Sequence, residues 1–114
     1  MIHKGEIYLT DRYRGGKKDY GRPVLILSSA ENNRETGCVV AAPLVSRERY
    51  AAASHIAVES VQGQTYVAVL EHVKSLPERS LQRRKDYLSR HAMARVEGTL
   101  CRLLELCAMW ELTV

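Results

Sequence analysis

A chain of 114 residues and 12.9 kDa is long enough to bury a core of its own, and we predict a single domain over residues 1–114. The formal net charge of +4 and the pI near 9.1 favour a polyanionic partner, nucleic acid first, although many basic enzymes carry a similar charge. The first residues lack a signal-peptide pattern, and no apolar run approaches the roughly 18 residues of a membrane span, so we expect a cytoplasmic protein.

Neither the cysteines nor the histidines are spaced as metal ligands. Cys38 falls on an expected strand, whereas Cys101 and Cys107 fall on an expected helix, and no CxxC pair occurs. The histidines are scattered along the chain, at His3, His55, His72 and His91. We therefore predict no metal, no cofactor and no disulfide framework, and we interpret the cysteines as small buried apolar residues.

The first part of the chain is typical of short strands. The first strand lies within residues 1–9, and a basic loop with glycines follows at 11–21. Residues 24–28 form a near-continuous apolar strand, and 30–37 are predicted as a turn rich in Asn and Gly. The next strand spans 38–46, where Pro43 indicates an edge, a bulge or a bend.

The pattern changes from strands to helices beyond the middle of the chain. Residues 55–60 alternate as a strand, 61–65 form a turn, and 66–76 are predicted as a strand pair or one long bent strand. Pro77 suits the first position of a short helix over 77–84, and Ser89 suits the N-cap of a second, amphipathic helix. The apolar face of that terminal helix repeats at spacings of three and four: Met93, Val96, Leu100, Leu103, Leu104 and Cys107. Together these elements predict an α+β class that is mainly β, with a small curled sheet or barrel.

Six motifs in order then suggest a family. They are KGEIYLTD (4–11), GRPVLILSS (21–29) after the basic loop, VVAAPLVS (39–46), SHIAV (54–58), VLEHVKSL (69–76) and the amphipathic terminal helix. Over about nine-tenths of the chain this order resembles the PemK/MazF family of bacterial toxins, and the combination of KGEIY, GRPVLI and AAPL-x-S is the specific part. The resemblance implies an SH3-like or curled β-barrel with a C-terminal helix, and a homodimer. It also implies metal-independent cleavage of single-stranded RNA by a type II toxin, with an acidic antitoxin segment on the same surface.

Arg22 is the first candidate catalytic residue. Cleavage of RNA without a metal uses the 2′-hydroxyl as nucleophile, and it needs a base, an acid and a cation facing the phosphorane. An arginine suits the cation's role because its guanidinium stays charged and binds phosphate through two bonds. Gly21 permits a sharp approach and Pro23 biases Arg22 toward extended backbone, so this step would hold Arg22 at a strand mouth. The resemblance agrees, since the arginine of the RP step is the residue most often assigned to catalysis. The alternative is a solvated arginine at a loop end.

The second candidate catalytic group departs from the pattern that the resemblance implies. The resemblance implies a threonine on the strand after the Pro-Leu step, where this sequence has Val45, which keeps the shape without the hydroxyl. Ser46 follows, but neighbouring strand residues face opposite sides unless a bulge re-aims one. Glu71 matches a carboxylate that some members use; its alternative is a strand-end glutamate paired with Lys74 or a loop cation, and we rank it above His72. The predicted catalytic set is Arg22, Ser46 and Glu71.

Two basic loops that contain tyrosines flank the Arg22 strand. Their composition suits phosphate contacts combined with base stacking, although a charged loop is often only a solvated one. The predicted RNA contacts are Arg12, Arg14, Lys17, Lys18, Tyr20, Arg47, Arg49 and His55.

Three functions follow from these observations. The first is a sequence-selective endoribonuclease toxin with single-stranded RNA, an acidic antitoxin and a second copy of the chain as partners. The second is a catalytically weak or inactive member that binds RNA or protein, which Val45 motivates. The third and weakest is a CcdB-like toxin that binds DNA gyrase through its terminal helix, since CcdB lacks a GRP step of this kind.

Overall fold

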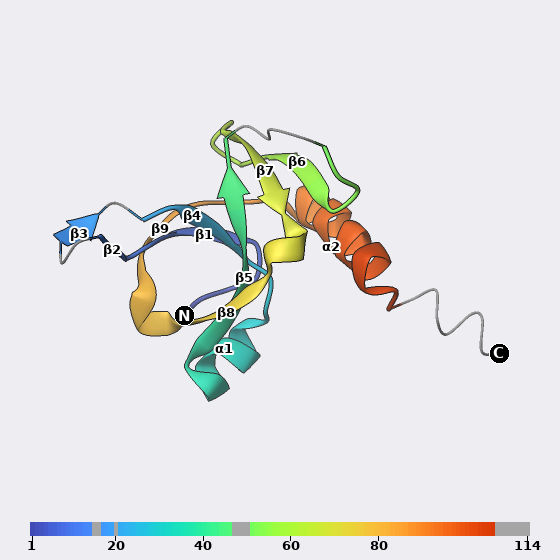
Figure 1. The fold of residues 1–114 in the computed structure, drawn as a ribbon. Coiled ribbons are helices and arrows are strands. Elements are labelled where there is room, and N and C mark those ends of the chain that lie inside the picture. The colour runs from blue at the N-terminus through green and yellow to red at the C-terminus, as the bar shows by residue number, and fades with distance from the viewer. Residues whose placement is uncertain (15–16, 20, 47–50, 107–114) are drawn as a thin grey trace.

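A curled antiparallel sheet with a helix packed on one side forms the body of the molecule (Figure 1). The computed structural model describes residues 1–14, 17–19, 21–46 and 51–106. The strands of the main sheet run in the order β6-β7-β5-β4-β1-β9, and β8 also pairs with β5. Their bounds are β1 Glu6–Thr10, β4 Pro23–Ile26, β5 Cys38–Val45, β6 His55–Glu59, β7 Thr65–Val69, β8 Lys74–Pro77 and β9 Leu81–Tyr87. The predicted class, mainly β with a curled sheet and a terminal helix, is confirmed.

The strand that follows Arg22 is buried on both faces. Leu25 packs with Ile7 in the larger core cluster, which also contains residues of the terminal helix. Val24 and Ile26 point the other way and pack with Val39 in a second cluster. Because both faces of β4 meet apolar side chains, its sequence is continuously apolar rather than alternating.

Pro43 lies where β5 changes partner. On one side β5 pairs with β4 from Ile26↔Ala41 to Val24↔Pro43. On the other side the ladder to β8 ends at Ala41 and the ladder to β7 begins at Leu44. A residue without an N–H is tolerated at this break, so the bend predicted for Pro43 corresponds to a change of strand partner.

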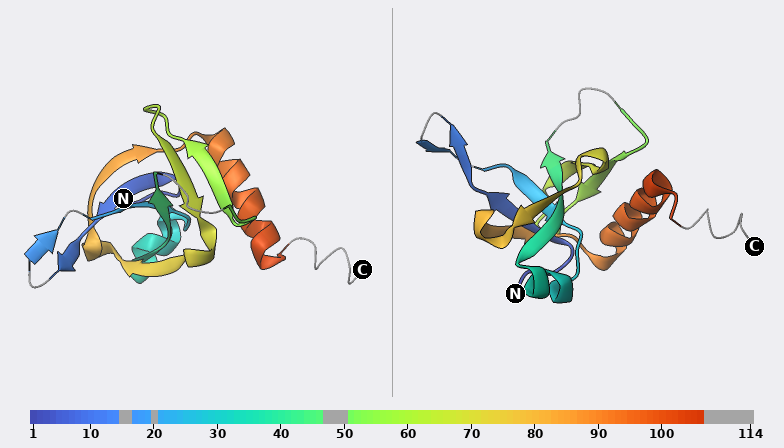
Figure 2. Two further views of the ribbon diagram at one scale, coloured as in Figure 1. Left: turned by 45° about the horizontal axis from the view of Figure 1, so that its top comes forward. Right: turned by 60° about the horizontal axis from the view of Figure 1, so that its bottom comes forward.

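The basic loop after β1 contains a hairpin. β2 (Arg12–Arg14) pairs antiparallel with β3 (Lys17–Asp19) in a separate small sheet. Figures 1 and 2 show this hairpin projecting from the body of the molecule, directly before the chain enters β4.

Residues 30–37 were predicted as a turn, and this prediction was wrong because they form a helix with both ends capped. In α1 (Ala30–Thr36) the Ser29 hydroxyl accepts a hydrogen bond from the Asn32 N–H at 3.2 Å. Gly37 ends the helix with a φ of 69°, a left-handed conformation that suits glycine.

The short helix predicted over 77–84 is also wrong. The structure has one 3₁₀ turn, η2 (Glu78–Ser80), followed by strand β9. β9 pairs with β1, and Arg84 forms an ion pair with the buried Glu6 at 3.1 Å, so pairing with a distant strand outweighs the local helix signal. Residues 66–76 are the strand pair of the prediction, β7 and β8, joined through the 3₁₀ turn η1 (Leu70–His72).

The terminal helix α2 (Arg90–Leu104) begins as predicted, with the Ser89 hydroxyl accepting from the Ala92 N–H at 3.1 Å. Its predicted apolar face is buried only in its first half. Met93 and Val96 lie in the core, whereas Leu104 is 55% exposed and Cys107 lies outside the described residues. Cys38 and Cys101 are half-buried. Neither described helix has the length and hydropathy of a membrane span.

Candidate functional site

The Gly-Arg-Pro step is packed tightly against the end of β1. Both the backbone N–H and the hydroxyl of Thr10 donate to the Arg22 carbonyl, at 3.2 and 3.1 Å. A Cβ atom placed on Gly21 would lie 1.0 Å from the Thr10 carbonyl oxygen, so only glycine fits there. The sharp approach predicted for Gly21 is therefore present, and it fixes the backbone of Arg22 at the mouth of β4.

The side chain of Arg22 is exposed beside the end of β5. Continuing the β4–β5 register by two residues beyond Val24↔Pro43 places Arg22 across from Val45, on the same face of the sheet as Val24. Val45 in turn pairs with Val67 of β7. Arg22 and the half-buried Val45 therefore share one face of the sheet on neighbouring strands, and Val45 presents methyl groups where the family resemblance implies a hydroxyl.

Two hydroxyl groups lie near this position. Ser46 is exposed one residue beyond the end of β5, outside the ladder. Thr10 lies on the other side of Arg22 and uses its hydroxyl to bind the Arg22 carbonyl at 3.1 Å. Ser46 is therefore the nearest hydroxyl to Val45 along the chain, and Thr10 holds the arginine.

Glu71 belongs to a hydrogen-bonded cluster in the turn η1. One carboxylate oxygen accepts from the Ser54 hydroxyl at 2.7 Å, and the other contacts Nε2 of His55 at 2.8 Å. These two hydrogen bonds, that of Ser54 first, lower the pKa of Glu71 to about 2. A carboxylate at neutral pH can only accept, so Nε2 of His55 carries the proton of this contact. Glu71 therefore lies in the turn between β7 and β8, and not on a strand as the family resemblance implied.

The two halves of the predicted catalytic set are separated in the fold. β4 and β7 are two strands apart, and Glu71 lies four residues beyond Val67, which is beside Val45. With about 4.8 Å between strands and 3.3 Å per residue, the backbones of Arg22 and Glu71 are on the order of 15 Å apart. Figure 1 shows the β2–β3 hairpin that leads into β4 on the left and η1 beside α2 on the right. One bound RNA strand can meet both residues, but at different nucleotides.

The other predicted RNA contacts are distributed over three segments. Arg12 and Arg14 belong to β2, and Lys17 and Lys18 to β3, in the hairpin directly before Arg22. His55, at the start of β6, is the predicted contact that the structure joins to Glu71; its side chain is only 6% exposed. Three of the predicted contacts lie outside the described residues: Tyr20, Arg47 and Arg49.

The described residues bring no group of three or more His, Cys, Asp or Glu side chains into a metal-binding arrangement.

Ser54 and Thr10 are the site residues that the sequence did not single out. Each is identified by a contact distant in sequence, Ser54 with Glu71 and Thr10 with Arg22, and no local motif marks such contacts.

Comparison with known proteins gives a family match over most of the chain. Residues 3–104 match the family model described as PemK-like, MazF-like toxin of type II toxin-antitoxin system. Among solved structures, a MazE-MazF crystal structure from Deinococcus radiodurans is 27% identical, with a TM-score of 0.76 and coverage of 92% of this chain and 96% of that chain.

Two further structures support the fold alone, because their identities are lower. An endoribonuclease in complex with its cognate antitoxin from Mycobacterial species is 22% identical, with a TM-score of 0.76 over 93% of this chain and 97% of that one. The Mycobacterium tuberculosis toxin MazF-mt6 is 21% identical, with a TM-score of 0.70 over 89% of this chain and 97% of that one.

Proposed function

The chain belongs to the family of PemK-like, MazF-like toxins of type II toxin-antitoxin systems, and on this premise we propose that it is an endoribonuclease that cleaves single-stranded RNA at selected sequences without a metal ion. The observation that carries the proposal is the exposed Arg22, whose backbone is fixed by Thr10 and by the close approach of Gly21. A cation held rigidly at its root is what stabilisation of a phosphorane requires, because its orientation is set before the reaction begins.

In the proposed reaction the 2′-hydroxyl of the substrate attacks the adjacent phosphorus, and the bond to the 5′-oxygen of the next nucleotide breaks. The proton of the 2′-hydroxyl leaves to a base, and the departing 5′-oxygen takes up a proton. The guanidinium of Arg22 binds the phosphate oxygens as their negative charge increases. The products are a 2′,3′-cyclic phosphate and a 5′-hydroxyl.

Ser46 and Glu71 have different parts in this proposal. Ser46, the exposed hydroxyl that follows Val45 in the sequence, is assigned to hydrogen bonding at the scissile phosphate. Glu71 is ionised at neutral pH and, with a pKa of about 2, is a weak base. We therefore assign its carboxylate to fixing the orientation of His55, further along the bound strand than the scissile phosphate.

The proposed partners follow from the family and the charge. They are single-stranded RNA, an acidic antitoxin segment that competes for the same basic surface, and a second copy of the chain in a homodimer, all in the cytoplasm. The net charge of +4 and the basic hairpin of β2 and β3 support a polyanionic ligand.

One observation favours a second function. Val45 lies beside Arg22 without the hydroxyl that the family resemblance implies, so a member that binds RNA but cleaves it weakly is the alternative. That protein would retain its affinity for RNA and lack turnover.

The test separates these two functions. Purified protein is incubated in EDTA with a mixed-sequence single-stranded RNA, and with the same sequence carrying 2′-deoxy nucleotides at the cleaved positions. The proposal expects cleavage of the first and not the second, with cyclic-phosphate and 5′-hydroxyl ends. Binding without cleavage would establish the alternative, and cutting at deoxy positions would exclude attack by the 2′-hydroxyl.

A further inference from the structure

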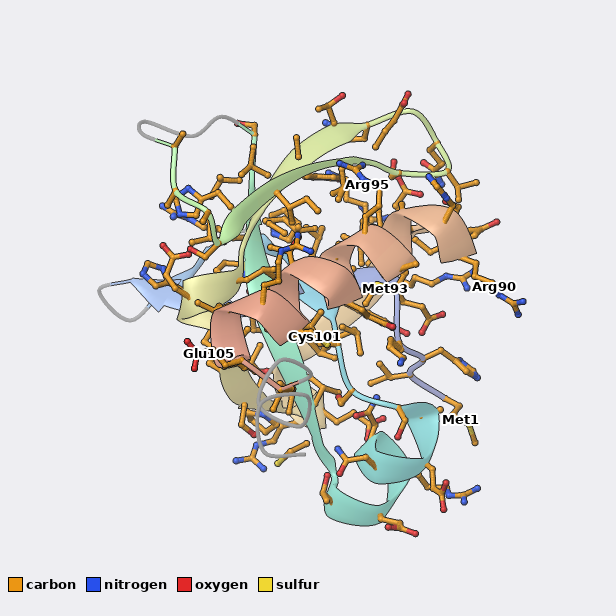
Figure 3. The ribbon with its side chains drawn as sticks, turned by 90° about the vertical axis from the view of Figure 1, so that its right-hand side faces the viewer. Met1, Arg90, Met93, Arg95, Cys101 and Glu105 are labelled. Carbon is orange, nitrogen blue, oxygen red and sulfur yellow. The ribbon has the colours of Figure 1, made fainter. Side chains whose placement is uncertain are left out.

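A hollow between β6 and α2 is lined by basic side chains. It has a volume of about 560 Å³, within the range of small-ligand sites, and none of the described residues that line it is acidic. The helix contributes His91, Arg95 and Arg102, and the start of β6 contributes His55. Figure 3, which looks onto α2, shows Arg95 on the side of the helix toward the strands above it.

The basic residues of α2 form one stripe. His91, Arg95 and Arg102 are spaced by four and then seven residues, which places them on one side of the helix. Within the described part of the chain no carboxylate forms an ion pair with either arginine. Positive side chains four residues apart on a helix repel one another and do not stabilise it, so this stripe is suited to binding an anion.

Gly98 helps to form the hollow. Glycine is unfavourable in the interior of a helix, where alanine is preferred. Among the described residues, a Cβ atom on Gly98 would meet Nη1 of Arg102 alone, at 3.7 Å, an ordinary contact, so packing within this part of the chain does not require glycine. The missing side chain leaves space beside the guanidinium, and Nη2 of Arg102 is held by the Thr99 hydroxyl at 3.2 Å.

His55 connects the hollow with the candidate site. Its ring contacts Glu71 at 2.8 Å and it also lines the hollow, so a strand that passes the Ser54–His55–Glu71 cluster meets Arg95 and Arg102 next. β6 is three strands from β4, which places this region on the order of 15 Å from Arg22. A phosphate here is therefore not the scissile one.

We propose that the hollow between β6 and α2 is a second phosphate-binding site, which takes a phosphodiester of the single-stranded RNA several nucleotides from the one at Arg22. This inference rests on the proposed function, because it extends the path that the RNA substrate follows across the protein. Arg95 and Arg102 supply paired N–H donors to the phosphate oxygens, and the space beside Gly98 admits the sugar-phosphate backbone. The site would set how long an RNA must be to bind fully.

The experiment measures the affinity of the full chain for 2′-O-methyl RNA, which has no free 2′-hydroxyl and cannot be cleaved by the proposed reaction. The variant Arg95→Ala/Arg102→Ala is compared with Arg34→Ala, an exposed arginine of α1 that does not line the hollow. For an oligonucleotide of about 16 nucleotides, we expect the double variant to raise Kd roughly tenfold. We expect the slope of log K against log salt to fall by about 0.7 for the lost phosphate, and Arg34→Ala to change neither quantity appreciably.

Two further measurements sharpen the test. Oligonucleotides too short to span both regions should lose less affinity in the double variant than the long oligonucleotide does. Gly98→Ala, which adds one methyl group beside the Arg102 guanidinium without a change of charge, should weaken binding of the long oligonucleotide while raising Tm, because alanine favours the helix.

The proposal is overturned if the double variant matches Arg34→Ala in Kd and salt slope. It is also overturned if the double variant loses affinity for polyglutamate and keeps its affinity for RNA, since the occupant would then be an acidic peptide. Because the probe cannot be cleaved, these outcomes do not depend on whether the protein cuts RNA, and failure of the proposed nuclease activity remains a separate result.

Discussion

Replacement of Gly21 by alanine tests whether the close contact with β1 holds Arg22. The new Cβ atom would lie 1.0 Å from the Thr10 carbonyl oxygen, and real Cβ contacts are essentially never shorter than 3.0 Å, so the two backbones must separate by about 2 Å. That displacement breaks the two hydrogen bonds from Thr10 to the Arg22 carbonyl. At about 1 kcal/mol for each bond and a similar amount for the disturbed end of the β1–β4 ladder, the expected loss of unfolding free energy is about 2–4 kcal/mol.

Gly37→Ala is the matched control for this variant. Gly37 has a φ of 69° and no atom within 4 Å of an added Cβ, so only the strained backbone conformation should cost free energy, about 1 kcal/mol. Urea denaturation measures both variants, and RNA cleavage is compared at equal folded fraction. A shift of Arg22 by 1 Å or more should lower kcat by about 100-fold in Gly21→Ala, and Gly37→Ala should cleave as the wild type does. Equal stability of the two variants, or wild-type cleavage by folded Gly21→Ala, would refute the reasoning.

Two other predictions concern Glu71 and Val45. The pKa of Glu71 is lowered to about 2, so its ionised form stabilises the fold above about pH 4.5, and this contribution is lost as the pH falls from 4.5 to 2. The difference in unfolding free energy between wild type and Glu71→Gln should shrink over that window. A difference that is constant with pH would contradict the hydrogen bonds of Glu71 with Ser54 and His55. Val45→Thr places a hydroxyl beside Arg22 and should raise the single-turnover cleavage rate at least about tenfold, with little loss of stability at a half-buried position. An unchanged rate would mean that this position does not meet the reacting phosphate.

Local sequence signals were sufficient where the structure depends on local geometry. The Ser89 N-cap and the periodicity of Met93 and Val96 predicted the beginning and the buried face of α2. Gly21 and Pro23 predicted a constrained approach for Arg22, which the packing against β1 explains.

Features that depend on distant pairing were not predictable in this way. Residues 81–84 were predicted as part of a helix over 77–84, yet they belong to β9, which pairs with β1 and from which Arg84 reaches Glu6. Ser54 is joined to Glu71 across 17 positions of sequence by a single hydrogen bond. The basic stripe on α2 was not predicted from the sequence, because its significance depends on the packing of α2 against β6.

The role of Arg22 as the cation at the scissile phosphate is tested most directly by single-turnover cleavage in EDTA of one RNA by three proteins: wild type, Arg22→Lys and Arg22→Ala. We expect Arg22→Ala to be about 10²–10³-fold slower than wild type. Arg22→Lys should lie between them, because it keeps the charge and loses the paired donors. Cleavage at the wild-type rate by folded Arg22→Ala would contradict the account.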